Sequence, residues 1–180
     1  STIAAGWVFW PESADVDGIA PAPGTYDAVI RRDTYGVPHV WGATDADAAY
    51  GLAWAHAEDD FPTIQQTFLA ARGTLASVFG PDAAPIDYFV HLLRIPETVD
   101  AGWAELPGDV QALCTAYADG LNHYAQEHPS EAMVGLFPLE GKDVVAAFTQ
   151  KVPLFFGLDG VLASLYSDER PDLQAAAQPS

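Results

Sequence analysis

Positive charge is scarce in this sequence. It has 7 Lys and Arg residues against 25 Asp and Glu residues, which gives a formal net charge of -18 at pH 7. A nucleic-acid surface needs clustered Lys and Arg to neutralise phosphates, so the composition argues against this class of binding protein. The acidic residues are spread along the chain. We expect them mainly to keep the protein soluble and, as the alternative, to attract a more basic partner.

Cysteine and long apolar runs are scarce as well. Cys114 is the single cysteine, so neither a disulfide framework nor a cysteine-rich metal site is expected. It lies between Leu113 and Tyr117 at helical spacing, which predicts a small buried core residue. A helix that spans a bilayer needs an apolar run of roughly 18 residues, and the sequence has no run of that length. We therefore predict no membrane contact. The chain opens without a basic region followed by an apolar one, and we expect any signal peptide to have been removed already.

The 180 residues are 49% hydrophobic and 12% aromatic, enough for one domain with a sizeable core. Residues 1–25 are rich in Pro, Gly and aromatic side chains, which predicts an extended arm that packs on a partner. Residues 26–167 are predicted to form the main domain. The polar stretch 168–180 is predicted to be a flexible tail.

Hydrophobic periodicity predicts a mainly helical α+β fold. Apolar residues alternate at 26–31 and 37–41, on either side of a turn at 33–36, as in a β-hairpin. Thr44 with Asp47 forms a capping box at the start of a helix, which Pro62 should kink and Gly73 should end. Three further helices are predicted at 86–93, at 107–124 and from Asp143 to 157.

The segment 56–60 concentrates polar groups and suggests either a metal site or acid–base chemistry. His56 and Asp60 are four residues apart on one helix face and are able to pair. Neither the zinc-protease motif nor the zinc-deaminase motif is completed. We therefore predict a scaffold role, in which Glu58, Asp59 and Asp60 pair with arginines such as Arg31, Arg32 or Arg72 and cap the restarted helix.

The remaining candidates for catalysis are isolated. His39 follows Pro38 in a strand and is predicted to be a partly buried structural histidine. His91, His123 and His128 stand in separate helical contexts and are not expected to cluster. No serine lies in a nucleophile motif. Ser1 has an α-amine that is able to act as a base, but no sharp strand start follows it. We expect no catalytic residue in this chain.

Three motifs give the sequence a family resemblance: Tyr-Gly-Val-Pro-His-Val at 35–40, Ala-His-Ala-Glu-Asp-Asp-Phe at 55–61, and Ala-Arg-Gly-Thr-Leu-Ala-Ser-Val-Phe-Gly at 71–80. The region resembles the small α subunit of penicillin acylases. Within that family, its overall sequence character is most similar to that of the acyl-homoserine lactone acylases. The resemblance implies an αββα N-terminal nucleophile hydrolase to which this chain contributes helices and an edge hairpin. It also implies a self-cleaved precursor, periplasmic or secreted, whose larger β chain carries the nucleophilic serine. Residues 168–180 would then include a spacer remnant.

The same resemblance assigns a substrate role to the helix that begins at Asp143. Phe148, Val152, Phe155 and Phe156 are the side chains expected to contact the acyl group of a small-molecule N-acyl substrate. The alternative is that all four are ordinary core residues. Leu162 stands where calcium-binding family members have a carboxylate, and Asp159 is displaced, so the resemblance argues against a metal site. No redox cofactor is implied.

The reaction expected from the resemblance is hydrolysis of the amide of N-acyl compounds, such as acyl-homoserine lactones, β-lactams or N-acyl amino acids. Serine attack on the amide carbonyl would take place on the larger chain. The alternative function is that of an acidic helical binding module that keeps an inactive acylase-like scaffold.

Overall fold

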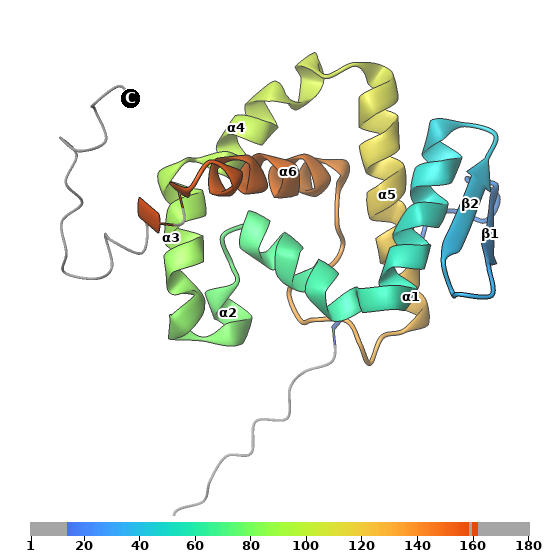
Figure 1. The fold of residues 1–180 in the computed structure, drawn as a ribbon, viewed down its shortest axis with the longest axis horizontal. Coiled ribbons are helices and arrows are strands. Elements are labelled where there is room, and N and C mark those ends of the chain that lie inside the picture. Colours follow the sequence, from blue (N-terminus) through green and yellow to red (C-terminus); the bar gives the residue numbers. More distant parts are fainter. Residues whose placement is uncertain (1–13, 159, 162–180) are drawn as a thin grey trace, which may run out of the picture.

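The structure is a computed structural model that describes residues 14–158 and 160–161 (Figure 1). The described part is mainly helical with one antiparallel two-stranded sheet, which confirms the predicted fold class. Its elements in chain order are β1 (Ala28–Arg32), β2 (Pro38–Gly42), α1 (Asp45–Ala71), α2 (Ala76–Phe79), the 3-10 turn η1 (Pro81–Ala83), α3 (Ala84–Leu92), α4 (Ile95–Gly102), the 3-10 turn η2 (Trp103–Glu105), α5 (Gly108–Glu127) and α6 (Gly141–Phe155).

The hairpin lies at one end of the molecule, against α1 (Figure 1). Its register pairs Ile30 with Val40, so that both side chains face α1. A Cβ on Gly51 of α1 would lie only 2.8 Å from Val40 Cγ1. Glycine at this position therefore lets the helix approach the sheet closely. The turn is held by Asp33, whose Oδ1 accepts hydrogen bonds from the backbone N–H groups of Tyr35 and Val37 at 2.8 and 3.0 Å.

Helix α1 begins and bends where the sequence predicts. The Thr44 side chain accepts a hydrogen bond from the backbone N–H of Asp47, and the Asp47 carboxylate accepts one from the N–H of Thr44, which completes the capping box. Asp60 has non-helical angles (φ -158°, ψ 66°) two residues before Pro62. The two halves of α1 therefore run in different directions, and Figure 1 shows them on either side of the bend.

Helix α5 packs along the first half of α1 through small residues. A Cβ on Gly120 would lie 2.5 Å from the Tyr50 carbonyl oxygen and 2.8 Å from Ala53 Cβ. Ala53 and Ala118 are almost fully buried at this contact. Close packing of the backbones replaces large side chains at this contact, and the core as a whole also includes larger buried residues such as Phe61, Leu69 and Leu121.

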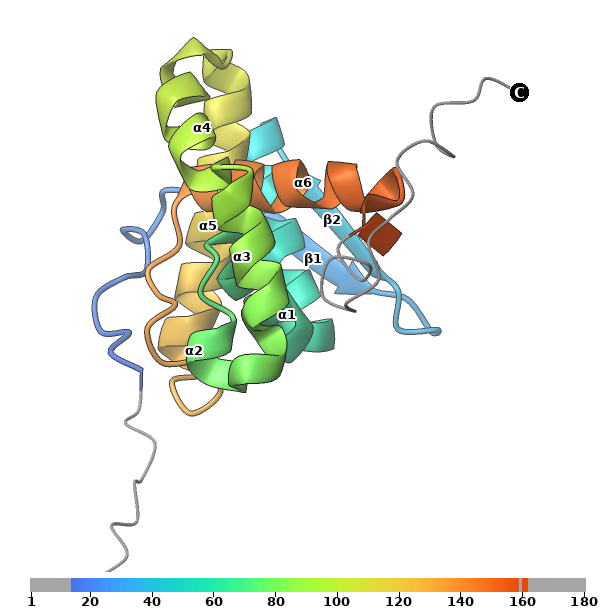
Figure 2. The same cartoon turned by 90° about the vertical axis from the view of Figure 1, so that its left-hand side faces the viewer.

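The second half of α1, α3, α4 and α6 form the other end of the molecule, and Figure 2 shows α3 and α4 from that side. Helix α4 was not predicted, although Pro96 lies in its first turn, where proline is compatible with a helix start. Helix α6 begins at Gly141, two residues before the predicted start.

Two regions pack differently from the sequence expectations. Residues 1–13 of the predicted arm lie outside the described residues, but Ala14 and Val16 are buried in this chain's own core. On α5, the helical spacing of Val110, Leu113, Cys114 and Leu121 predicts that all four share one buried face. Val110 and Leu113 are both 39% exposed, whereas Cys114 and Leu121 are buried as expected. The predicted boundaries at 25 and 167 stay predictions.

Candidate functional site

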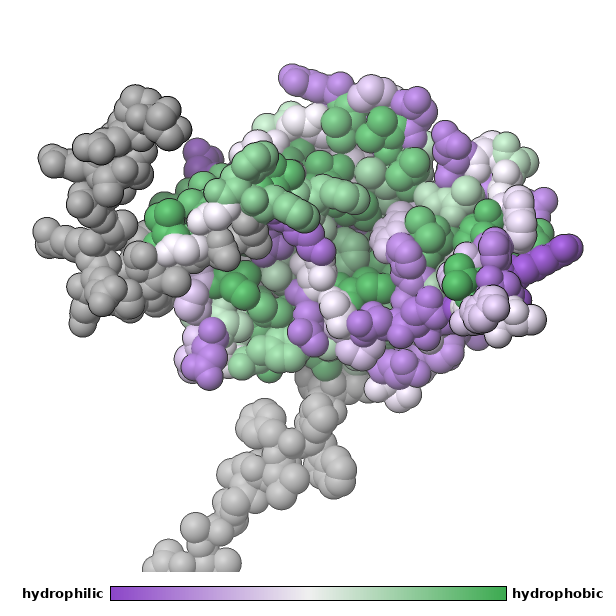
Figure 3. Space-filling model, viewed as in Figure 1, coloured by the Kyte–Doolittle hydropathy of each residue, from purple (hydrophilic) through white to green (hydrophobic). Residues whose placement is uncertain are grey.

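The four residues predicted to bind substrate lie on or just after α6, and all four are exposed. The exposed fractions are 71% for Phe148, 54% for Val152, 88% for Phe155 and 85% for Phe156. Phe148, Val152 and Phe155 follow one another at four- and three-residue spacing and so share one side of the helix. Within the described part of the chain, none of the four is a core residue. Figure 3 shows apolar side chains along α6.

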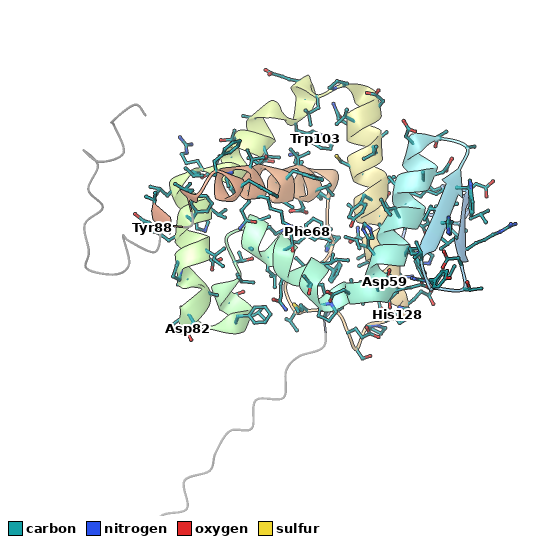
Figure 4. All side chains as sticks on the ribbon, in the orientation of Figure 1. Asp59, Phe68, Asp82, Tyr88, Trp103 and His128 are labelled. Atoms are coloured by element: carbon teal, nitrogen blue, oxygen red, sulfur yellow. The ribbon has the colours of Figure 1, made fainter. Side chains whose placement is uncertain are left out.

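A groove with a volume of about 680 Å³ lies beside this exposed stripe. The first half of α1, its second half, α5 and α6 form its walls, and β2 closes one end. Phe148 lines the groove, whereas Val152, Phe155 and Phe156 lie outside it. Figure 4 labels Phe68 on the second half of α1, which supplies part of one wall. The groove-lining side chains are mostly apolar, among them Ala48, Leu52, Ile64, Phe68, Leu113 and Val144.

His56 lies on the groove wall and pairs with Tyr117 of α5. Its Nδ1 atom is 3.0 Å from the Tyr117 hydroxyl, and the two rings meet edge to face. The four-residue spacing also allowed a pair with Asp60, but Asp60 accepts from the Thr63 N–H instead, because the chain leaves helical geometry at Asp60. Burial raises the pKa of the Tyr117 hydroxyl, so it stays protonated at neutral pH.

An ion pair fixes the start of α6 to the end of α1. Arg72 donates from Nε to Asp143 Oδ1 at 2.7 Å and from Nη2 to Asp143 Oδ2 at 2.6 Å. The same guanidinium also donates to the backbone carbonyls of Leu136 and Pro138. Asp143 lies in the first turn of α6, where the helix dipole favours a carboxylate. One arginine therefore positions both the helix and the loop before it.

Two buried amides hold the rest of the α5–α6 loop. Gln65 donates to the Glu131 carbonyl at 3.0 Å and accepts from the Met133 N–H at 2.6 Å. Asn122 makes the equivalent two bonds with the backbone of Leu139, at 2.9 and 2.7 Å. Both side chains are nearly inaccessible to solvent. Neither residue was among the predicted site residues, although a polar residue on the apolar face of a predicted helix is a usable signal for such a role.

The acids at 58–60 make the scaffold contacts predicted for them. Arg32 pairs with Glu58 at 2.9 Å and with Asp59 at 2.8 Å, which ties the hairpin to α1. Asp60 accepts a hydrogen bond from the Thr63 N–H at the restart of the helix. Figure 4 labels Asp59 close to the bend of α1.

The histidines differ from expectation at two places. His39 is more exposed than expected, with 50% of its side-chain surface accessible, because its strand position faces away from α1. Its ring stacks on Trp41, and its Nε2 atom lies 3.4 Å from Asp33 Oδ2. His123 and His128 were expected to stand apart, but both pack against Trp54, which lies between them on α1. The expectation rested on the five-residue spacing of the two histidines along α5. The indole ring of Trp54, on the facing helix α1, is wide enough to contact both.

Other candidate chemistry is limited in the described residues. No group of three His, Cys, Asp or Glu side chains there is arranged to hold a metal ion. Asp159 and Leu162, on which the argument against a calcium site rests, lie outside the described residues. Within 14–158 and 160–161, no helix is both long and apolar enough to cross a bilayer. Burial raises the pKa of the Cys114 thiol, which lowers its reactivity.

The comparison with known families decides how this surface is interpreted. A family model described as penicillin amidase matches residues 27–158. The chain belongs to the penicillin amidase family. The match includes the hairpin, both halves of α1 and the whole of α6, so the predicted family membership is confirmed.

Individual relatives agree with this result. The chain is 30% identical over 175 residues to the acyl-homoserine lactone acylase PvdQ of Pseudomonas putida. This alignment covers 89% of this chain and 22% of that protein. It is 28% identical over 95 residues to the penicillin acylase 2 proenzyme of a Pseudomonas species, covering 53% of this chain and 12% of that one. The chain thus spans less than a quarter of the length of these curated relatives.

A solved structure supports the fold directly. The thermostable penicillin G acylase of Alcaligenes faecalis contains a chain that superposes with a TM-score of 0.63 at 25% identity. The superposition covers 84% of this chain and 80% of that chain. The matched chain is therefore of similar length to this one, and the acylase fold accounts for most of the described residues.

Proposed function

We propose that this chain is the small subunit of a self-processed, two-chain amidohydrolase that cleaves the amide of N-acyl compounds. The substrates proposed are acyl-homoserine lactones, β-lactams or N-acyl amino acids. Family membership supports amide hydrolysis by an acylase. A penicillin G acylase chain of similar length supports the small subunit, and a relative named as a proenzyme supports processing.

The observation that carries the proposal is the exposed apolar stripe of α6 on a member of this family. Phe148, Val152 and Phe155 face away from the core, so they are free to contact an acyl group or a second chain. Serine chemistry is assigned to the larger chain, whose α-amine would relay the proton. The described residues of this chain would supply binding and positioning.

The proposed compartment is the periplasm or the exterior, since the family resemblance implies export. The partner proposed is a larger chain from the same precursor. This chain's acids would contribute to solubility in either compartment. Fractionation of the source cells, with the small chain detected by antibody, checks this part: recovery in the cytoplasm would contradict it.

The test is an assay of the protein with the larger chain. Purified two-chain protein is incubated with an acyl-homoserine lactone, a penicillin and an N-acyl amino acid, and the free amine is quantified. Release from at least one class supports the proposal. An assembled protein that releases no amine from any of them would favour the alternative, an acidic helical binding module on an inactive scaffold.

A further inference from the structure

Arg72 stands at a fixed point of the chain. It caps the C-terminal end of α1, where its backbone N–H donates to the Phe68 carbonyl at 3.0 Å. Gly73 follows in the left-handed region, with φ 68°, and its carbonyl oxygen lies 3.0 Å from Nε2 of His91 on α3. A Cβ at Gly73 would lie 2.7 Å from the same His91 atom, so the backbone passes close against α3. The base of the Arg72 side chain is therefore held from two sides.

From this point the guanidinium group reaches the start of α6 in several directions. Its Nε and Nη2 atoms donate to the two carboxylate oxygens of Asp143. Its two Nη atoms also donate to the carbonyls of Leu136 and Pro138, just before the helix. A bidentate pair adds geometric specificity, because two parallel bonds must be satisfied at once. Lysine, a point charge on a flexible stem, is unable to reproduce these bonds together.

Packing determines the direction of α6 less sharply. The helix packs against α1, α4 and α5 (Figure 1), and its buried side chains near the first turn include the small Ala146 and Ala147. Apolar contact is non-directional, and methyl groups form shallow ridges that interlock weakly. The second ion pair of α6, Lys142 with Asp100 of α4, is exposed and contributes little. The direction of α6 therefore depends strongly on the bidentate pair at its first turn.

The length of α6 converts a small tilt at this turn into a larger displacement of the exposed stripe. With a rise of about 1.5 Å per residue, Phe148 lies about 7.5 Å and Phe155 about 18 Å along the axis from Asp143. A tilt of about 3° at Asp143 would therefore move Phe155 by about 1 Å. Misplacement of a bound substrate by about 1 Å is able to cost roughly 100-fold in rate.

We propose that Arg72 is a positioning residue for acyl specificity. Through Asp143 it sets the direction of α6, and thereby the place of Phe148 and Phe155 relative to the amide carbonyl that the larger chain attacks. Arg72 would itself contact neither the substrate nor the reacting atoms. The inference rests on the proposed function, because it takes the α6 stripe as the acyl-binding surface. In a purely structural role, by contrast, loss of Arg72 would lower the amount of folded enzyme and change nothing else.

The experiment uses the two-chain protein and the hexanoyl and dodecanoyl amides of one amine: homoserine lactone, the penicillin nucleus or an amino acid, whichever the protein accepts. The ratio of kcat/KM for the two amides does not depend on how much enzyme is folded. Arg72→Met should change this ratio by at least about tenfold, since an unclamped α6 displaces Phe155 more than Phe148. Arg72→Lys, which keeps the charge without the fork, should change it by about two- to tenfold and decides the test if Arg72→Met fails to assemble.

Two further variants separate position from stability. Asp87 on α3 accepts hydrogen bonds from the Leu75 and Ala76 N–H groups at 2.8 Å each, and neither bond involves α6. Asp87→Ala should destabilise the chain and keep the ratio within about twofold of the parental value, because distant sites act independently. The double variant Arg72→Met with Asp143→Asn leaves no buried charge unpaired, so stability recovers in part while the clamp stays absent. Its ratio should remain as far from the parental value as that of Arg72→Met.

An unchanged ratio in both single Arg72 variants, or a ratio restored together with stability in the double variant, would overturn the proposal. If the unaltered protein cleaves none of the amides, the proposed function fails, and dissociation constants of hexanoic and dodecanoic acid, measured by calorimetry, form the ratio instead. A shift of that ratio in Arg72→Met and not in Asp87→Ala would support positioning without hydrolysis. An unshifted ratio, or no binding of either acid, would overturn the positioning role as well.

Discussion

Replacement of Arg72 by methionine should be among the most destabilising single changes in this chain. The substitution removes both hydrogen bonds to Asp143 and the donors to the Leu136 and Pro138 carbonyls. The Asp143 side chain is 13% exposed, and after the substitution it would still accept a hydrogen bond from the Glu140 N–H, which is 2.7 Å long in the structure. Breaking a buried ion pair by removing one partner costs about 3–5 kcal/mol. Because Arg72 is 28% exposed, we expect the lower end, about 3 kcal/mol.

The chain offers a matched control for this prediction. Lys142 and Asp100 form an ion pair of nearly the same length, 2.7 Å, but their side chains are 37% and 65% exposed. Exposed pairs contribute about 0.2–1 kcal/mol, so Lys142→Met should cost less than 1 kcal/mol. Arg72→Met combined with Asp143→Asn should recover part of the loss, because no unpaired charge then remains buried.

The assay is thermal unfolding of the assembled protein followed by circular dichroism, with urea unfolding to give the free energy. The free energy from urea unfolding decides the test, and Arg72→Met should lower it by about 3 kcal/mol. The melting temperature should fall as well, by less than the roughly 2–4 °C per kcal/mol of a 150–250-residue domain, because the assembled protein is larger. The reasoning would be refuted if Arg72→Met and Lys142→Met lowered the free energy of unfolding by the same amount.

Three further predictions concern the stripe, the hairpin and the acids of α1. Phe155→Ala and Phe156→Ala should each shift relative kcat/KM along a series of acyl lengths, by about 10- to 200-fold per methylene mismatch; an unchanged profile would remove these residues from the substrate site. The Tyr35 and Val37 N–H groups hold the pKa of Asp33 below its usual value. The stability from this turn is therefore present above the unfolded pKa of about 3.9 and lost as pH falls through the lower folded value. The protection factors of the turn amides, which compare measured exchange with that of an unstructured chain at the same pH, should fall on acidification, and Asp33→Ala should show low protection factors already at pH 7. Glu58→Gln should lower the free energy of unfolding by at most about 1 kcal/mol, since its pair with Arg32 is exposed, and turnover should stay constant. A thousandfold loss of turnover would instead give Glu58 a catalytic role.

Local rules predicted the elements that position the site. The capping box at Thr44, the bend before Pro62 and the hairpin around Asp33 follow from neighbouring residues and appear in the structure. Charge alone predicted that Glu58 and Asp59 pair with an arginine such as Arg31, Arg32 or Arg72, and the structure identifies Arg32 as the partner.

Contacts between distant segments were predicted poorly. Periodicity marked Leu113 as core, but it measures which residues share a face and not whether another element covers that face. His56 bonds to Tyr117, 61 residues away, since the bend of α1 removes its local partner. The sequence shows Gln65 and Asn122 as polar residues on apolar helix faces, but the backbone groups to which they bond, 17 or more residues away, are identified only by the structure.

The two-chain account is tested most directly by the mass and N-terminal sequence of whatever copurifies with this chain in its native form. The account predicts a larger chain that begins with serine, in equal amount, and no intact precursor. Recovery of this chain alone, or with a partner that does not begin with serine, would contradict it.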